Sequence, residues 1–154
     1  RLLMRARHKL TKCFPAVALA LLPLMAAALD YRSVAVSGAP MLAEPAPQSK
    51  KLYLFSRDTP LELVSVHNGW AKVRDVSGAM GWMEVRNLAQ KRTVQVTVPR
   101  AEVRLRAEDG APVLYAVERD VSLELLEPPS GSWAKVRHRD GKPGYIPIKS
   151  IWGL

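Results

Sequence analysis

The stretch Trp70-Ala71-Lys72-Val73-Arg74 recurs unchanged at residues 133–137, which lie 63 positions further along the chain. The sequence around the two copies also matches, since residues 52–63 correspond to 114–125 and residues 81–82 correspond to 144–145. Order, spacing and residue character therefore persist over roughly sixty residues, which is the signature of an internal repeat. We predict that the body of the chain consists of two copies of one small module.

Within the repeated stretch, polar and apolar residues alternate with a period of two. This alternation is typical of a β-strand, in which successive side chains point to opposite faces. Ala71 and Val73 are predicted to face a core, and Trp70, Lys72 and Arg74 to face outward. The second copy repeats the pattern, with Ala134 and Val136 inward and Trp133, Lys135 and Arg137 outward.

Turn signals separate the predicted strands in both copies. Ser77-Gly78 and Asp140-Gly141 lie between apolar stretches, and Asn68-Gly69 and Gly131-Ser132 precede the two tryptophans. Asn-Gly and Asp-Gly pairs favour hairpins because both residues tolerate a positive φ angle. Short strands at this spacing predict an all-β chain made of two small antiparallel barrels, residues 29–91 and 92–154.

The first 28 residues have the pattern of a secretory signal peptide. Five basic residues precede an apolar run over residues 13–29, and Ala26-Ala27-Ala28 offers a cleavage site made of small residues. A retained membrane anchor is the alternative, although Pro15 and Pro23 interrupt the 17-residue apolar run. We expect cleavage after Ala28 and a periplasmic or otherwise extracytoplasmic location, with contact to a membrane only through an uncleaved segment.

Signal cleavage would change the charge and cysteine content of the chain. Five of the 23 Lys and Arg residues and the single cysteine, Cys13, belong to the segment, so the formal net charge falls from +9 to +4 and no disulfide remains. A nucleic-acid partner is not expected at this modest charge. It stays an alternative only if the segment is retained in the cytoplasm.

The order Leu-Glu-Leu, turn, Trp-Ala-Lys-Val-Arg, hairpin, Gly-Trp or Gly-Tyr resembles bacterial Src-homology-3-type (SH3-like) domains over about residues 33–154. These are extracytoplasmic modules often found in tandem behind a signal peptide. The resemblance implies barrels of five to six strands that bind peptides or cell-wall components without catalysis of their own. In eukaryotic relatives a tryptophan, a proline and several tyrosines form a groove for polyproline helices. Trp70 and Trp133 match that tryptophan, but only the second copy has the proline, Pro147, where the first has Glu84.

The candidate ligand-binding residues are therefore Trp70, Lys72, Arg74, Trp133, Lys135, Arg137 and Pro147. An exposed indole with cationic neighbours suits a peptide that carries carboxylates, or the face of a sugar. The alternative is that the tryptophans pack internally with the cations stacked on them. Pro147 makes the second copy the better candidate for peptide binding and the first the better candidate for support.

The remaining side chains are assigned to structure. Trp82, Tyr145 and Trp152 are expected to pack, and Tyr53 and Tyr115 to anchor a long loop or else border a ligand groove. Glu62 and Glu124 are expected to be solvated. His67 and His138 lack the spacing of metal ligands, so no metal, cofactor or catalytic activity is expected.

The sequence thus favours an exported, non-enzymatic binding module whose partner is peptidoglycan or a periplasmic or envelope protein. The alternative is a structural or scaffold protein whose barrels make protein–protein contacts without a polymer ligand. The sequence leaves the oligomeric state open.

Overall fold

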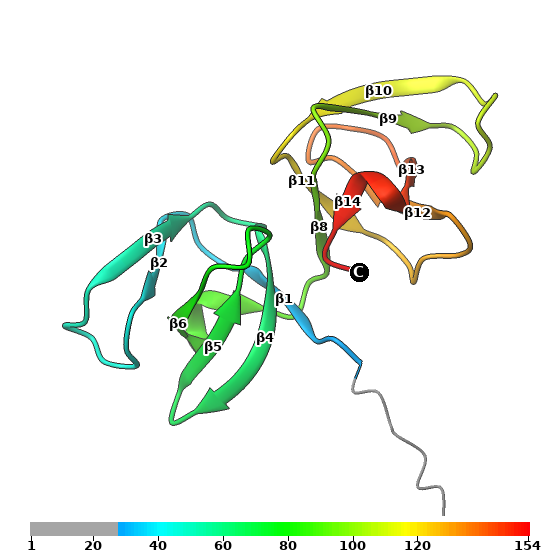
Figure 1. The fold of residues 1–154 in the computed structure, drawn as a ribbon. Coiled ribbons are helices and arrows are strands. Elements are labelled where there is room, and N and C mark those ends of the chain that lie inside the picture. Colours follow the sequence, from blue (N-terminus) through cyan, green and yellow to red (C-terminus); the bar gives the residue numbers. More distant parts are fainter. Residues whose placement is uncertain (1–27) are drawn as a thin grey trace, which may run out of the picture.

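The computed structural model describes residues 28–154 and contains two antiparallel sheets of the same topology (Figure 1). The expected signal peptide lies outside the described residues, except for Ala28. Each sheet has seven strands, in the orders β3-β2-β6-β5-β4-β1-β7 and β10-β9-β13-β12-β11-β8-β14. The prediction of an all-β chain with two tandem antiparallel modules is confirmed. Within residues 28–154 there is no helix long and apolar enough to cross a membrane.

The elements of the first barrel occupy residues 31–89. They are β1 (Tyr31–Val34), β2 (Ala39–Leu42), β3 (Lys51–Phe55), β4 (Pro60–His67), β5 (Trp70–Arg74), β6 (Met80–Glu84), the 3₁₀ turn η1 (Val85–Asn87) and β7 (Leu88–Ala89). The second barrel occupies residues 93–152 with β8 (Thr93–Val96), β9 (Arg100–Arg104), β10 (Val113–Glu118), β11 (Ser122–Leu125), β12 (Trp133–Arg137), β13 (Gly144–Pro147), η2 (Ile148–Ser150) and β14 (Ile151–Trp152). The two-residue strands β7 and β14 account for the excess over the expected five to six.

Each barrel has its own apolar core, to which the repeated stretch contributes two residues. Ala71 and Val73 in β5, like Ala134 and Val136 in β12, have no exposed surface. They pack with larger side chains such as Met83 in the first core and Ile146 in the second. The predicted inward half of the repeat is therefore correct.

The glycine of each Gly-aromatic pair is required by close packing. A Cβ atom on Gly81 would lie 2.6 Å from Met41 Cγ, and one on Gly144 would lie 2.6 Å from Val103 Cγ1 and 2.9 Å from a backbone oxygen. Real side chains do not approach so closely, because atoms in a packed core have no free volume to give. The two barrels share this close contact, where β6 pairs with β2 and β13 pairs with β9.

The junction between the barrels is partly aromatic. Tyr31 of β1 meets Trp152 of β14 edge to face, with ring centroids 5.2 Å apart and planes at 87°. The guanidinium of Arg92 lies 5.4 Å from the Tyr31 ring, and its Nη2 donates a hydrogen bond of 2.8 Å to the Gly153 carbonyl. Trp152 therefore packs as expected, and its aromatic partner belongs to the first barrel.

Candidate functional site

The outward face of the second barrel gathers an aromatic, a proline and a cation on two paired strands. Trp133 of β12 lies directly opposite Pro147 of β13, and Lys135 lies directly opposite Tyr145. All four side chains are half-buried. The sequence had assigned Tyr145 to packing, but the strand register places it on the same face as Trp133. The result is a compact apolar surface that surrounds one lysine.

The outward face of the first barrel has the same layout with one change in chemistry. Lys72 of β5 lies opposite Trp82 of β6, and Trp70 lies opposite Glu84. Glu84 forms an ion pair with Arg86. A carboxylate therefore stands where the second barrel has Pro147, so the two tryptophan faces differ in the charge beside the indole.

The arginine that ends each repeated stretch is held by a glutamate of the preceding strand. Arg74 donates to Glu62 and Arg137 donates to Glu124, each over 2.9 Å. The prediction that both glutamates are solvated is wrong for Glu62, which is only 9% exposed. Its burial follows from its pairing with Tyr31 across β1 and β4, and the ion pair compensates its charge. Arg74 and Arg137 are thus structural partners as well as candidate ligand contacts.

Tyr31 is the one described residue whose acidity is clearly changed by the fold. Burial raises the pKa of its phenol, because a phenolate loses solvation there, and the negative charge of Glu62 raises it further. The nearby guanidinium groups of Arg92 and Arg74 act in the opposite direction without reversing the shift. The protonated phenol therefore belongs to the native junction between the barrels.

The two repeat tyrosines differ in their surroundings. Tyr115 donates from its hydroxyl to the Lys142 carbonyl over 3.0 Å and accepts from the His138 amide over 3.3 Å, so it anchors the β12–β13 hairpin. Tyr53 is 53% exposed on the edge strand β3, beside the exposed Leu54. The anchoring interpretation thus holds for Tyr115 and not for Tyr53.

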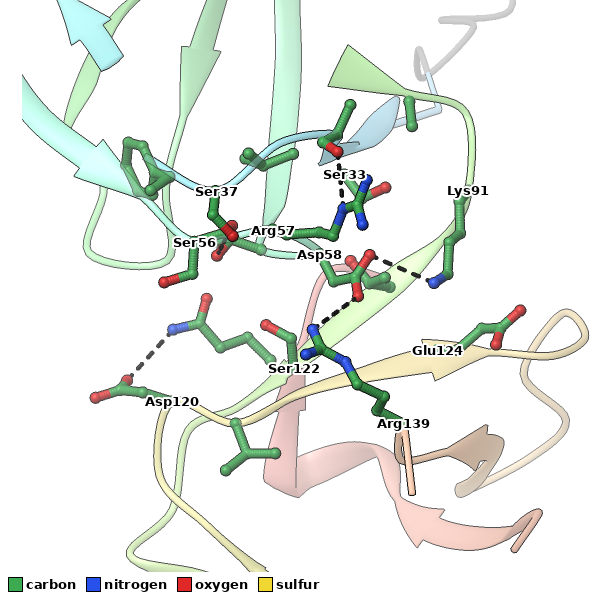
Figure 2. A pocket seen from close by; sticks show the side chains of 18 of the residues that line it. Ser33, Ser37, Ser56, Arg57, Asp58, Lys91, Asp120, Ser122, Glu124 and Arg139 are labelled. Atoms are coloured by element: carbon green, nitrogen blue, oxygen red, sulfur yellow. Dashed lines mark hydrogen bonds and ion pairs between the residues drawn. The ribbon is translucent and has the colours of Figure 1, made fainter. Parts of the chain in front are cut away.

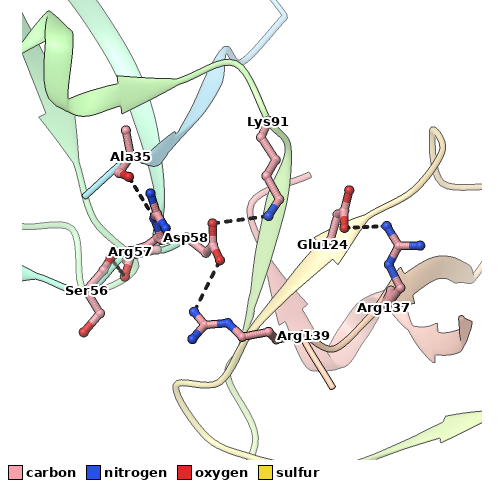
Figure 3. A network of polar contacts seen from close by, with 9 residues as sticks. Ala35, Ser56, Arg57, Asp58, Lys91, Glu124, Arg137 and Arg139 are labelled. Atoms are coloured by element: carbon pink, nitrogen blue, oxygen red, sulfur yellow. Dashed lines mark hydrogen bonds and ion pairs between the residues drawn. The ribbon is translucent and has the colours of Figure 1, made fainter. Parts of the chain in front are cut away.

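A cleft of about 1430 Å³ separates the two barrels, and sequence reasoning did not foresee it. Figure 2 shows polar and charged side chains from both barrels converging on this space. Asp58, which follows β3, accepts from Lys91 over 3.3 Å and faces Arg139 over 3.6 Å (Figure 3). Lys91 belongs to the segment that joins the barrels, so a three-residue ion cluster connects both barrels and the linker.

The sequence did contain a signal for the position of Asp58, namely a repeated Arg-Asp pair. Asp58 belongs to an Arg-Asp pair that repeats as Arg119-Asp120, and both aspartates adopt the left-handed conformation with φ of 70°. Aspartate tolerates this conformation better than most residues. The turn after β3 thereby points one carboxylate toward the cleft, and the equivalent turn before β11 does the same with Asp120, which also lines the cleft.

Among residues 28–154, no group of three or more His, Cys, Asp and Glu side chains is arranged to hold a metal ion. The site residues are instead aromatic, cationic and carboxylate groups on two small barrels. The duplicated sequence matches the family described as the bacterial SH3 domain, once at residues 35–90 and again at residues 97–153. The chain belongs to the bacterial SH3 domain family.

Two solved structures that resemble parts of this chain come from larger proteins. NlpC2 of Trichomonas vaginalis is 14% identical, with a TM-score of 0.37 over 81% of this chain and 48% of that one. An NlpC/P60 family protein of Bacillus cereus is 16% identical, with a TM-score of 0.35 over 80% of this chain and 56% of that one. This tandem of bacterial SH3 domains spans about half the length of those proteins. No curated protein matches the chain by sequence.

Proposed function

We propose that this protein is a non-enzymatic binding module of the bacterial cell envelope that contacts peptidoglycan peptides, or a periplasmic protein, through its tryptophan faces. It acts outside the cytoplasm, in keeping with the signal-like residues 1–28 and with its family. The observation that carries the proposal is the surface on β12 and β13, where Trp133 faces Pro147 and Lys135 faces Tyr145. Two bacterial SH3 domains on one chain would also raise apparent affinity for a repetitive polymer.

The chemistry of the second face suits an acidic peptide. The indole and the proline ring offer a flat apolar platform, and the Lys135 ammonium can meet a carboxylate beside it. On the first barrel, the Glu84 carboxylate beside Trp70 repels such a ligand. The second face is therefore the principal peptide site, and the first face is a weaker copy or a support.

Titration with soluble muropeptides tests this function. We expect the indole resonance of Trp133 and the amides of β12 and β13 to shift in heteronuclear NMR spectra, with smaller shifts at Trp70. The Lys135→Gln variant should bind several-fold more weakly, because it loses a charge-assisted contact. Exposed Lys149 on η2 offers a matched control in Lys149→Gln, which should bind normally. Silence at both tryptophans with millimolar ligand would reject the proposal.

A scaffold role is the second candidate, and one observation favours it. The edge strand β3 of the first barrel exposes Leu52, Tyr53 and Leu54, and an exposed edge can add a strand from another protein. Cross-linking in intact cells followed by mass spectrometry separates the two functions. One dominant protein partner linked near β3 would support the scaffold, whereas recovery with the sacculus would support polymer binding.

A further inference from the structure

We propose that Asn68 is a site of spontaneous covalent modification, where the side-chain amide reacts with the Gly69 backbone nitrogen and is converted into a carboxylate. Asn68 and Gly69 form the turn at the tip of the β4–β5 hairpin, directly before Trp70 (Figure 1). Three features of the turn support this site: the chemistry of an asparagine followed by glycine, a backbone nitrogen without a partner, and an exposed side-chain amide.

The reaction needs only water as a co-reactant, and asparagine is among the thermolabile residues. The Gly69 nitrogen gives its proton to a base of the solvent and attacks Cγ of Asn68, so that a new N–C bond forms. The bond between Cγ and Nδ2 then breaks, and Nδ2 takes up a proton from water and leaves as ammonia. Water next opens the cyclic imide. Opening at Cγ gives aspartate, and opening at the main-chain carbonyl gives isoaspartate, in which the backbone runs through the side-chain carbons.

The backbone nitrogen of Gly69 is free to react. It donates no hydrogen bond to another residue of the described part of the chain, whereas the Gly69 carbonyl accepts one from the Val85 amide over 2.9 Å. Glycine has no side chain to shield this nitrogen, and even a Cβ atom on Gly69 would meet nothing within 4 Å. The space around the attacking atom is therefore open.

The side-chain amide of Asn68 is exposed and weakly held. Asn68 adopts the left-handed conformation with φ of 48°, which asparagine tolerates in a hairpin turn. Its Nδ2 lies 3.3 Å from Nε2 of the exposed His67, and the amide has no other hydrogen-bond partner among residues 28–154. Exposed turns open locally at a low cost in free energy. The Asn68 side chain can therefore rotate until Cγ meets the Gly69 nitrogen.

The other asparagine of the chain, Asn87, lacks these features. It is half-buried, and the residue that follows it is Leu88, whose branched side chain shields the backbone nitrogen. The Leu88 nitrogen is also engaged, because it donates to the Val85 carbonyl. The second barrel has Gly131-Ser132 at the corresponding turn, which carries no side-chain amide. The reaction therefore favours the first barrel, at Asn68.

Modification would change the surroundings of Trp70. Either product places a new carboxylate at the turn beside the face on which Glu84 already lies opposite Trp70. Isoaspartate also adds a carbon atom to the backbone of the turn. This addition shifts the Gly69 carbonyl, which holds the Val85 amide just after β6. We expect the modification to displace Trp70 and to leave Trp133 of the second barrel unchanged.

The test incubates the folded protein at mildly alkaline pH and follows each asparagine by peptide mapping with mass spectrometry. Asn68 should gain the mass that separates a carboxylate from an amide about tenfold faster than Asn87, which is the control within the same molecule. An isoaspartyl methyltransferase identifies the isoaspartate product. Asn68→Gln should abolish the fast conversion, because the longer side chain closes the imide ring far more slowly. A synthetic peptide of residues 64–72 shows when the conditions suffice for reaction.

Ion exchange separates the modified protein, which carries the additional negative charge, for NMR spectroscopy. Conversion at Asn68 together with a shifted Trp70 indole resonance and an unchanged Trp133 resonance supports the proposal. An intact Asn68 after the peptide has fully reacted overturns it, because the turn then protects the amide. Equal rates at Asn68 and Asn87 overturn it as well, as does a modified protein with an unchanged Trp70 resonance. These measurements contain no ligand, so they leave the proposed binding function to its own test.

Discussion

At the scale of single residues, the buried hydroxyl of Thr93 should lower the stability of the protein. This hydroxyl is buried at the start of β8 without a hydrogen-bond partner in residues 28–154. Replacement by valine keeps the branched shape and removes the unpaired oxygen, so Thr93→Val should raise the free energy of unfolding by about 1 kcal/mol. Urea denaturation measures the change, and the less buried Thr97→Val serves as the control. A destabilised Thr93→Val protein would show that the hydroxyl does have a partner.

Tyr31 gives the residue-scale prediction for pH. Its pKa is raised in the native state, so above pH of about 10 the unfolded chain loses the phenolic proton while the native state retains it. The contribution of the protonated Tyr31 phenol to the free energy of unfolding is therefore complete below that pH. It is lost as the pH rises through the native pKa. Relative to the natural protein, Tyr31→Phe should become more stable above pH of about 10 than it is at pH 7. A constant difference in the free energy of unfolding from pH 7 to 11 would contradict this.

At the scale of the strand, close contact with the neighbouring strand β9 requires a glycine at the start of β13. Gly144→Ala would place a Cβ atom 2.6 Å from Val103 Cγ1 and 2.9 Å from the Arg104 carbonyl, and a backbone oxygen cannot move aside. We expect a loss of about 1–3 kcal/mol in the free energy of unfolding. Gly110→Ala, where a Cβ would meet nothing within 4 Å, should change it by less than about 0.5 kcal/mol. Equal effects from the two substitutions would show that β13 does not lie so close to β9.

The strands were predictable because their determinants are local. Period-two alternation places Ala71 and Val73 in one core and Ala134 and Val136 in the other, and the repeat fixes their common topology. Burial of Glu62 was not predictable, because it depends on β1, which pairs with β4 from across the module. For the same reason the sequence did not place Trp82 and Tyr145 beside the lysines of the neighbouring strand, a position that only the register reveals.

At the scale of the whole molecule, the contacts between the barrels were not predictable from either copy. The cleft depends on how one barrel is placed against the other, and that placement involves Tyr31, Trp152 and Arg92, which lie outside the best-matched part of the repeat. Trp152→Ala removes an edge-to-face aromatic pair worth about 0.5–1.5 kcal/mol beyond its buried area. It should loosen the junction, so calorimetric unfolding should separate into two transitions. A single transition with an unchanged midpoint would show that the pair does not couple the barrels.

The central claim is that the module binds cell-wall peptides, chiefly through the face that carries Trp133. Co-sedimentation with purified sacculi tests it most directly, with Trp133→Ala and Trp70→Ala compared at equal concentration after circular dichroism confirms that both remain folded. The account predicts that Trp133→Ala loses most of the sacculus-bound fraction and that Trp70→Ala loses much less, because Pro147 stands opposite Trp133 and Glu84 stands opposite Trp70. Retention of both variants at the level of the natural protein would contradict it.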